Sequence, residues 1–147
     1  YIIHILGYGS EDSIIKLKEK VKEIHTDSES CMVSYDGCKL GEEYILFLAK
    51  CRIGICPRIL DDSLSDYTFP SKVLAYISNG LLPICSPLSC IKESKIYNHV
   101  LFAKQVTPDA FAEAIMSVDI PFLCNYDNSI LYQLNLNLIA ELRCLFN

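Results

Sequence analysis

Asp66-Tyr-Thr-Phe-Pro-Ser-Lys-Val-Leu-Ala-Tyr-Ile-Ser-Asn-Gly-Leu-Leu-Pro-Ile-Cys-Ser86 predicts a loop, a short helix, a tight turn and a buried strand in succession. Pro70 suits the first turn of a helix, where its missing N–H is no loss, and Ser71 is expected to cap the amides that follow. Asn79-Gly80 supplies the left-handed residue that ends a helix. Pro83 is expected at the start of the strand, because inside it a proline would remove a ladder hydrogen bond.

The helix that this stretch predicts begins with features of an anion site. Its N-terminus presents amides and a partial positive charge, and Ser71 and Lys72 stand beside it. Cations are disfavoured at that end of a helix, so Lys72 indicates an anion nearby. The alternative is a solvent-exposed lysine on a first helical turn. Tyr76 is expected to pack rather than to bind a ligand.

Strands and helices alternate along the rest of the chain. Apolar runs and helical spacing predict these elements in order: a strand over Tyr1–Leu6, a helix from Ser10, a strand over Cys31–Tyr35 with a turn at Asp36-Gly37, a helix over Glu42–Lys50, a strand over Arg52–Cys56, a short helix over Leu88–Lys95, a strand over Val100–Ala103, a helix capped by Thr107, and a long helix over Asp127–Phe146. This alternation with short links is typical of a doubly wound α/β sheet.

Composition excludes several classes of protein. The chain has 147 residues, about half of them hydrophobic, and a net charge of −5. It is therefore long enough for one domain with a real core, and it lacks the basic surface of a general nucleic-acid-binding protein. We expect no membrane span and no secretory signal. Because Tyr1 lies inside a predicted strand and no initiator Met precedes it, we expect a fragment of a longer protein.

The eight cysteines do not form a metal or disulfide pattern. The sequence contains no C-x-x-C pair, and the histidines His4, His25 and His99 are scattered. We expect reduced thiols in the core of a cytosolic protein and no metal site. We also find no Ser-His-Asp order, no paired carboxylates at a convincing spacing and no H-E-x-x-H motif, so the sequence shows no general base.

Residues Phe69–Tyr76 and Asn79–Ile84 resemble the P-S-K-x-x-E-Y-x-x-x-G-x-P-V-I signature of GT-B glycosyltransferases, which lies in the C-terminal, nucleotide-sugar-binding half of those enzymes. The matching residues are Ser71, Lys72, Tyr76, Gly80 and Pro83. Ala75 stands where the family has a glutamate that usually holds the ribose hydroxyls. Gly7-Tyr8-Gly9 is similar to the G-x-G that opens the same family segment, although a strand-to-helix turn could equally require these glycines.

The resemblance implies a Rossmann-like doubly wound parallel sheet, the C-terminal half of a retaining, group-1-like GT-B glycosyltransferase. Residues 1–147 would be a single nucleotide-sugar-binding domain of a longer two-domain enzyme. That enzyme would transfer a sugar from a nucleotide diphosphate to a glycan or lipid-linked acceptor, as in surface polysaccharide biosynthesis. It would need no metal or other cofactor, and would act in the cytoplasm or at the inner membrane face. The domain alone is expected to bind its donor weakly and to be inactive.

The resemblance also assigns roles to residues. Lys72 and the amides from Ser71 to Val73 would neutralise the leaving diphosphate, and the two glycines would let the backbone approach the phosphates. Tyr8 and Arg58 would flank the pocket, and Asp36 and Gly37 would meet the base. The candidate binding residues are therefore Gly7, Tyr8, Gly9, Asp36, Gly37, Arg58, Ser71, Lys72 and Val73.

Two alternatives remain from the sequence. The loop from Pro57 to Phe69 follows a central strand, where open α/β sheets bind ligands, but it could also be a solvated loop whose aspartates neutralise Arg58. The whole chain could be a non-catalytic interaction or regulatory module with a degenerate transferase fold. A receiver-type module is disfavoured, because Gly7-Tyr8-Gly9 stands where an acidic pair would be needed.

Overall fold

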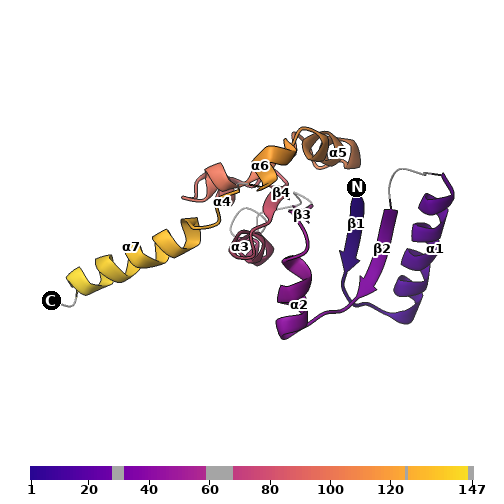
Figure 1. Ribbon diagram of the computed structural model, residues 1–147, viewed down its shortest axis with the longest axis horizontal. Coiled ribbons are helices and arrows are strands. Elements are labelled where there is room, and N and C mark those ends of the chain that lie inside the picture. Colours follow the sequence, from indigo (N-terminus) through magenta and orange to yellow (C-terminus); the bar gives the residue numbers. More distant parts are fainter. Residues whose placement is uncertain (28–31, 59–67, 125, 146–147) are drawn as a thin grey trace. The chain divides into compact units, whose positions relative to one another are not determined.

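The computed structural model describes residues 1–27, 32–58, 68–124 and 126–145 (Figure 1). The chain divides into two compact units, Tyr1–Tyr44 and Ile45–Asn147, and each is described by itself. Strands and helices alternate along both, and every pair of strands in the two small sheets is parallel. The structure thus confirms the α/β class.

The first unit is a strand–helix–strand motif. It contains β1 (Ile2–Leu6), α1 (Glu11–Asp27) and β2 (Met32–Gly37), and β1 pairs with β2 (Figure 1). Helix α1 packs along β2. The predicted start of this helix is confirmed, since the Ser10 hydroxyl accepts a hydrogen bond from the Ser13 amide at 3.3 Å.

The end of β2 departs from the predicted turn. Ile5 lies opposite Tyr35, but Leu6 lies opposite Gly37, so Asp36 is an extra residue that bulges from the ladder. Gly37 takes a left-handed conformation with φ of 74°. Its carbonyl accepts a 3.0 Å hydrogen bond from the Gly7 amide, which extends the pairing past the bulge. The prediction of a turn at Asp36-Gly37 is therefore wrong.

The second unit places helices on both faces of a parallel sheet. The strands β3 (Ile53–Cys56), β4 (Leu82–Cys85) and β5 (Leu101–Phe102) follow that order across the sheet. Helix α3 (Ser71–Ser78) covers one face through Val73 and Ile77. Helix α5 (Pro108–Met116) covers the other face, where it packs on Ile84. The unit therefore has a helix–sheet–helix arrangement with a core on each side of the sheet.

The other described elements are helices: α2 (Gly41–Leu48), α4 (Ser89–Lys92), the 3-10 turn η1 (Tyr97–His99), α6 (Ile120–Cys124) and α7 (Ile130–Leu145). The unit boundary falls within α2. The predicted cap of α5 is confirmed, because the Thr107 hydroxyl accepts from the Ala110 amide at 3.3 Å.

Helix α7 is packed at its start and exposed further on. Ile130, Leu131 and Leu134 pack against the core on the α3 side of the sheet. Leu138 and Leu142, in the second half of the helix, are exposed. None of the helices within the described ranges is both long and apolar enough to span a membrane.

Pro83 lies inside the central strand, not at its start as predicted. The amides of Leu82 and Ser86 donate to carbonyls on the β3 side of β4. Backbone groups of successive strand residues point to opposite neighbouring strands, so those of position 83 point toward β5. The pairing of β4 with β5 begins at Ile84 and Leu101. Continued by one residue, this register would make the His99 carbonyl the acceptor for an amide at position 83, which proline lacks. The Tyr126 hydroxyl donates to that carbonyl at 2.7 Å and so supplies a hydrogen bond that proline cannot make.

Candidate functional site

The N-terminus of α3 presents backbone amides without a capping side chain. Pro70 is the N-cap residue and Ser71 the first helical residue, so the prediction that Ser71 caps the helix is wrong. The Val73 amide donates to the Pro70 carbonyl at 3.0 Å, and its side chain is fully buried. Among the described residues, no side chain caps α3. The amides of Ser71 and Lys72 are then the donors that the first turn leaves for an anion.

Arg58 is held beside this terminus by two backbone contacts. Its amide donates to the hydroxyl of Ser86 at 2.8 Å, and its guanidinium donates to the Thr68 carbonyl at 2.8 Å. Ser86 is fully buried and its own amide donates to the Cys56 carbonyl at 3.3 Å. The predicted residue Arg58 is thus fixed by Ser86, a serine that sequence reasoning left unassigned although it directly follows the apolar strand.

Lys72 and Arg58 both act on the carboxyl end of β3. The pKa of the Cys56 thiol is lowered to about 7, first by a hydrogen bond with Cys85, against the opposing effect of burial, and then by the charges of Lys72 and Arg58. The first turn of α3 carries no acidic residue. The helix end, Lys72 and Arg58 therefore form a positive site, called here the α3 seat.

Tyr76 packs in the second unit, as predicted, and does not point to the α3 seat. An added Cβ at Gly54 would lie 2.3 Å from the Tyr76 ring, so only glycine fits beneath it. The Tyr76 hydroxyl donates to the Ile55 carbonyl at 3.3 Å. The glycine of β3 and the tyrosine of α3 are thus one packing unit that fixes the helix over the sheet.

The first unit brings its glycines to a small hollow. Gly7, Tyr8 and Gly9 border a cavity of about 110 Å³ with Tyr35, whose hydroxyl donates to the Gly7 carbonyl at 2.8 Å. This volume is well below the roughly 300 Å³ of the smallest usual ligand pockets. Tyr8 itself is 89% exposed. The hollow is too small to enclose a nucleotide.

Neither glycine of the G-x-G is required by the local backbone. The left-handed glycines in the described chain are Gly37, Gly41 and Gly80. An added Cβ at Gly7 would meet no atom of the described residues within 4 Å, and one at Gly9 would make an ordinary contact of 3.7 Å. The strand-to-helix turn therefore gives no steric reason for these two glycines.

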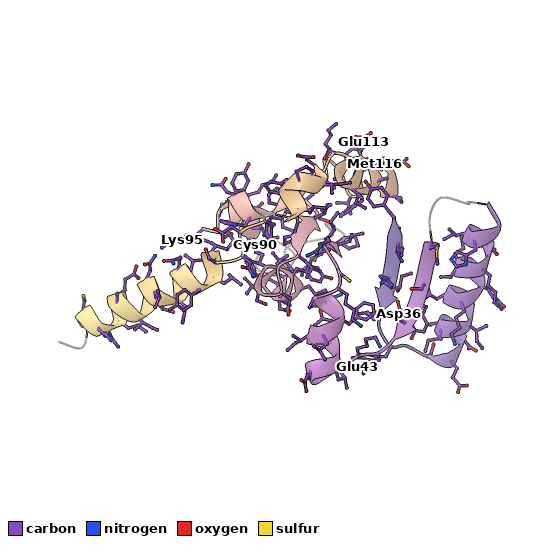
Figure 2. All side chains as sticks on the ribbon, in the orientation of Figure 1. Asp36, Glu43, Cys90, Lys95, Glu113 and Met116 are labelled. Atoms are coloured by element: carbon purple, nitrogen blue, oxygen red, sulfur yellow. The ribbon has the colours of Figure 1, made fainter. Side chains whose placement is uncertain are left out.

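A polar cluster that the sequence did not suggest joins β1 to β2. The Asp36 carboxylate accepts hydrogen bonds from Ser34 at 2.8 Å and from Nδ1 of His4 at 2.9 Å. Figure 2 labels Asp36 near the arrowhead end of β2. The Ser34 hydroxyl is also 3.0 Å from the same Nδ1. A catalytic triad needs serine and carboxylate on different ring nitrogens, so this cluster ties the strands together and is no triad.

Electrostatics explains why Asp36 stays charged. Burial alone would raise its pKa, but the hydrogen bonds from His4 and Ser34 and the charges of His4 and Lys39 outweigh burial and lower the pKa. The period of two along β2 puts Ser34 and Asp36 on one face. The register of β1 against β2 then adds His4, which lies opposite Ser34. With its carboxylate so engaged, and with the Gly37 carbonyl accepting from Gly7, the two residues predicted to meet a base already have partners.

The predicted residues therefore fall into two groups, one in each unit. Gly7, Tyr8, Gly9, Asp36 and Gly37 belong to the first unit, and the group from Arg58 to Val73 belongs to the second. The expectation that aspartates of the 57–69 loop contact ligand or Arg58 concerns residues 59–67, which lie outside the described part of the chain.

A second hollow, of about 330 Å³, lies between β5 and α5 and contains none of the predicted residues. The ion pair between Lys104 and Glu113, at 3.3 Å, is at its rim. Over the described ranges, no three His, Cys, Asp or Glu side chains come together as metal ligands. Among the described residues, the α3 seat is therefore the site at which predicted ligand-binding residues come together. Comparisons of the chain with protein-family models, curated proteins and solved structures find no match.

Proposed function

We propose that this chain is the donor-binding part of a glycosyltransferase with a Rossmann-like, GT-B-type fold, and that the α3 seat holds the diphosphate of a nucleotide-sugar. One observation carries the proposal: Lys72, Arg58 and the uncapped N-terminus of α3 converge at the carboxyl end of β3. In open parallel α/β sheets, ligands bind outside the carboxyl ends of the strands. Ser71 and Lys72, at this end of α3, also carry the resemblance to the glycosyltransferase signature.

The charges of the two units favour the α3 seat over α1 for the diphosphate. Helix α1 begins with Glu11 and Asp12, whose negative charges would repel a phosphate at its N-terminus. Helix α3 begins with no acidic residue and with Lys72. The proposal therefore assigns phosphate binding to Arg58, Ser71 and Lys72, and assigns no phosphate contact to Gly7 and Gly9.

The chemistry at this seat would be stabilisation of a leaving group. When the bond between the sugar and the diphosphate breaks, negative charge grows on the diphosphate oxygens. A fixed cation and backbone amides aimed at those oxygens lower the energy of that state without moving. No described residue of the seat is a base for the acceptor. Following the resemblance, we propose that the acceptor-binding and proton-accepting groups come from the other domain of the longer enzyme or from the donor itself.

The test is a calorimetric titration of the chain with UDP, GDP, ADP and CDP at low salt. We expect one of the four to bind, and Lys72→Ala to weaken that binding by about tenfold or more, as the loss of a charge-assisted contact predicts. Lys50→Ala is the matched control, because it removes the same charge from the residues preceding β3, at the opposite end of that strand. Its affinity should equal that of the unchanged protein.

Two results would count against the proposed phosphate site. Binding that Lys72→Ala and Lys50→Ala weaken alike would show a general charge effect rather than a seat. Binding of none of the four nucleotides would leave two interpretations: a site that is incomplete without an upstream unit, or an interaction module in which Ala75 marks the loss of ribose recognition. The same titration of the full-length protein separates them.

A further inference from the structure

Two thiols lie side by side in the second unit and have no role in the proposed function. Cys56 ends β3 and Cys85 ends β4, and the two residues are direct partners in the parallel register. Both side chains belong to the core on the α3 side of the sheet, and they are hydrogen-bonded to each other. We infer that Cys56 and Cys85 form a vicinal dithiol, a site of oxidative modification that closes to a disulfide when a peroxide reaches it.

The strand geometry permits the bridge. Neighbouring strands lie about 4.8 Å apart, and disulfides join Cα atoms roughly 4.4–6.8 Å apart. Partners in register on the same face therefore already have the required separation. The bond between the Ser86 amide and the Cys56 carbonyl, at 3.3 Å, keeps the two strand ends in that register.

The environment assigns different roles to the two sulfurs. Cys56 is 7% exposed and Cys85 is fully buried. A hydrogen bond from Cys85, and after it the charges of Lys72 and Arg58, lower the pKa of Cys56 against the effect of burial. The same hydrogen bond, then burial and the charge of Cys56, raise the pKa of Cys85. Since the thiolate is the reactive form, Cys56 is the nucleophile and Cys85 the resolving thiol.

The chemistry balances with one peroxide per pair. The Cys56 thiolate attacks a peroxide oxygen, the O–O bond breaks, and the sulfur becomes a sulfenic acid while the other oxygen leaves as hydroxide or alkoxide. Cys85 then attacks the Cys56 sulfur, the S–O bond breaks, and the departing hydroxide takes the Cys85 proton to form water. Two thiols are oxidised to one disulfide, and the peroxide is reduced. This step does not depend on nucleotide binding.

The test treats the whole folded chain with a small excess of hydrogen peroxide, alkylates the remaining thiols, and maps the digest by mass spectrometry without reduction. We expect a linked Cys56–Cys85 peptide as the main product, absent after Cys56→Ser or Cys85→Ser. In Cys85→Ser, a sulfenic-acid probe such as dimedone should label Cys56. In Cys56→Ser, it should not label Cys85.

Variants at other thiols serve as controls. Cys38→Ser and Cys144→Ser remove exposed thiols and should leave the yield of the linked peptide unchanged. If a serine variant melts early, Cys56→Ala and Cys85→Ala replace it, because alanine buries no hydroxyl. Oxidation confined to Cys38 and Cys144, or a Cys56–Cys85 link found only after denaturation, overturns the inference.

Discussion

The two units follow the same strand–helix–strand plan, but they differ in how many of their apolar side chains are buried. In the first unit, Val33 is the one apolar side chain among the described residues that is buried. In the second, two separate clusters of buried side chains lie on opposite faces of the sheet. The first unit is instead joined by polar contacts, above all those of Asp36. The same chain pattern thus yields an apolar core on each face of the sheet in the second unit, and half-buried apolar packing with polar contacts between the strands in the first.

The largest expected difference between the units comes from truncating an isoleucine in each. Ile77 is fully buried on α3, and Ile15 on α1 is 54% exposed. Ile77→Ala should lower the free energy of unfolding by about 2–5 kcal/mol, whereas Ile15→Ala should change it by less than about 0.5 kcal/mol. Urea denaturation followed by circular dichroism measures both. Equal losses would contradict the comparison.

Adding a methyl group to a glycine in each unit comes next. Gly54→Ala places a Cβ against the Tyr76 ring and should destabilise by about 1–3 kcal/mol. Gly7→Ala, the matched change in the first unit, meets open space in the described structure and should have little effect. In a Tyr76→Ala background most of the Gly54→Ala penalty should vanish, which a double-mutant cycle of urea denaturations would detect. An unchanged penalty would mean that the clash lies elsewhere.

A smaller effect is expected from the hydroxyl of Tyr126. Tyr126→Phe leaves the His99 carbonyl without its 2.7 Å donor and should destabilise the protein by about 1–2 kcal/mol. Tyr132→Phe, at an exposed tyrosine, is the control. Burial, with the charges of Asp127 and Cys85, raises the pKa of Tyr126 to about 12. The stability it adds is complete below pH 10 and is lost as pH rises to about 12, which absorbance of the phenolate would follow.

The smallest predicted effect is the pH response of the polar cluster in the first unit. The pKa of Asp36 is below its ordinary value of 3.8, so the folded state binds fewer protons there than the unfolded state. The contribution of Asp36 is complete above pH 3.8 and is lost as pH falls through the lower value. Asp36→Asn should flatten this step in acid unfolding. A step that survives in the variant would assign it to other carboxylates.

Local signals in the sequence predicted most element starts. Ser10 and Thr107 cap the helices that they were expected to cap, because a cap depends only on the residues that follow it within one turn. Tyr76 packs as expected. The errors at Pro83 and at Asp36-Gly37 share a cause: whether a residue belongs to a strand depends on the neighbouring strand, which sequence spacing does not specify.

The candidate site was predictable only in part for the same reason. Lys72 was found because a cation on a first helical turn is locally unusual. The link between Ser86 and Arg58, and the cluster around Asp36, join residues 28 and 32 positions apart and depend on strand register. The pair of Cys56 and Cys85 is a further case, because both were expected as separate core thiols.

The proline in the central strand has a consequence for how this sequence can vary. If the β4–β5 register were continued by one residue, an amide at position 83 would reach the His99 carbonyl. Because a carbonyl oxygen has two lone pairs, it could accept from that amide beside the Tyr126 hydroxyl, but it would no longer depend on the hydroxyl for a donor. Across related chains, we therefore expect the tyrosine to be kept where position 83 is proline and to be freer to vary where position 83 supplies an amide.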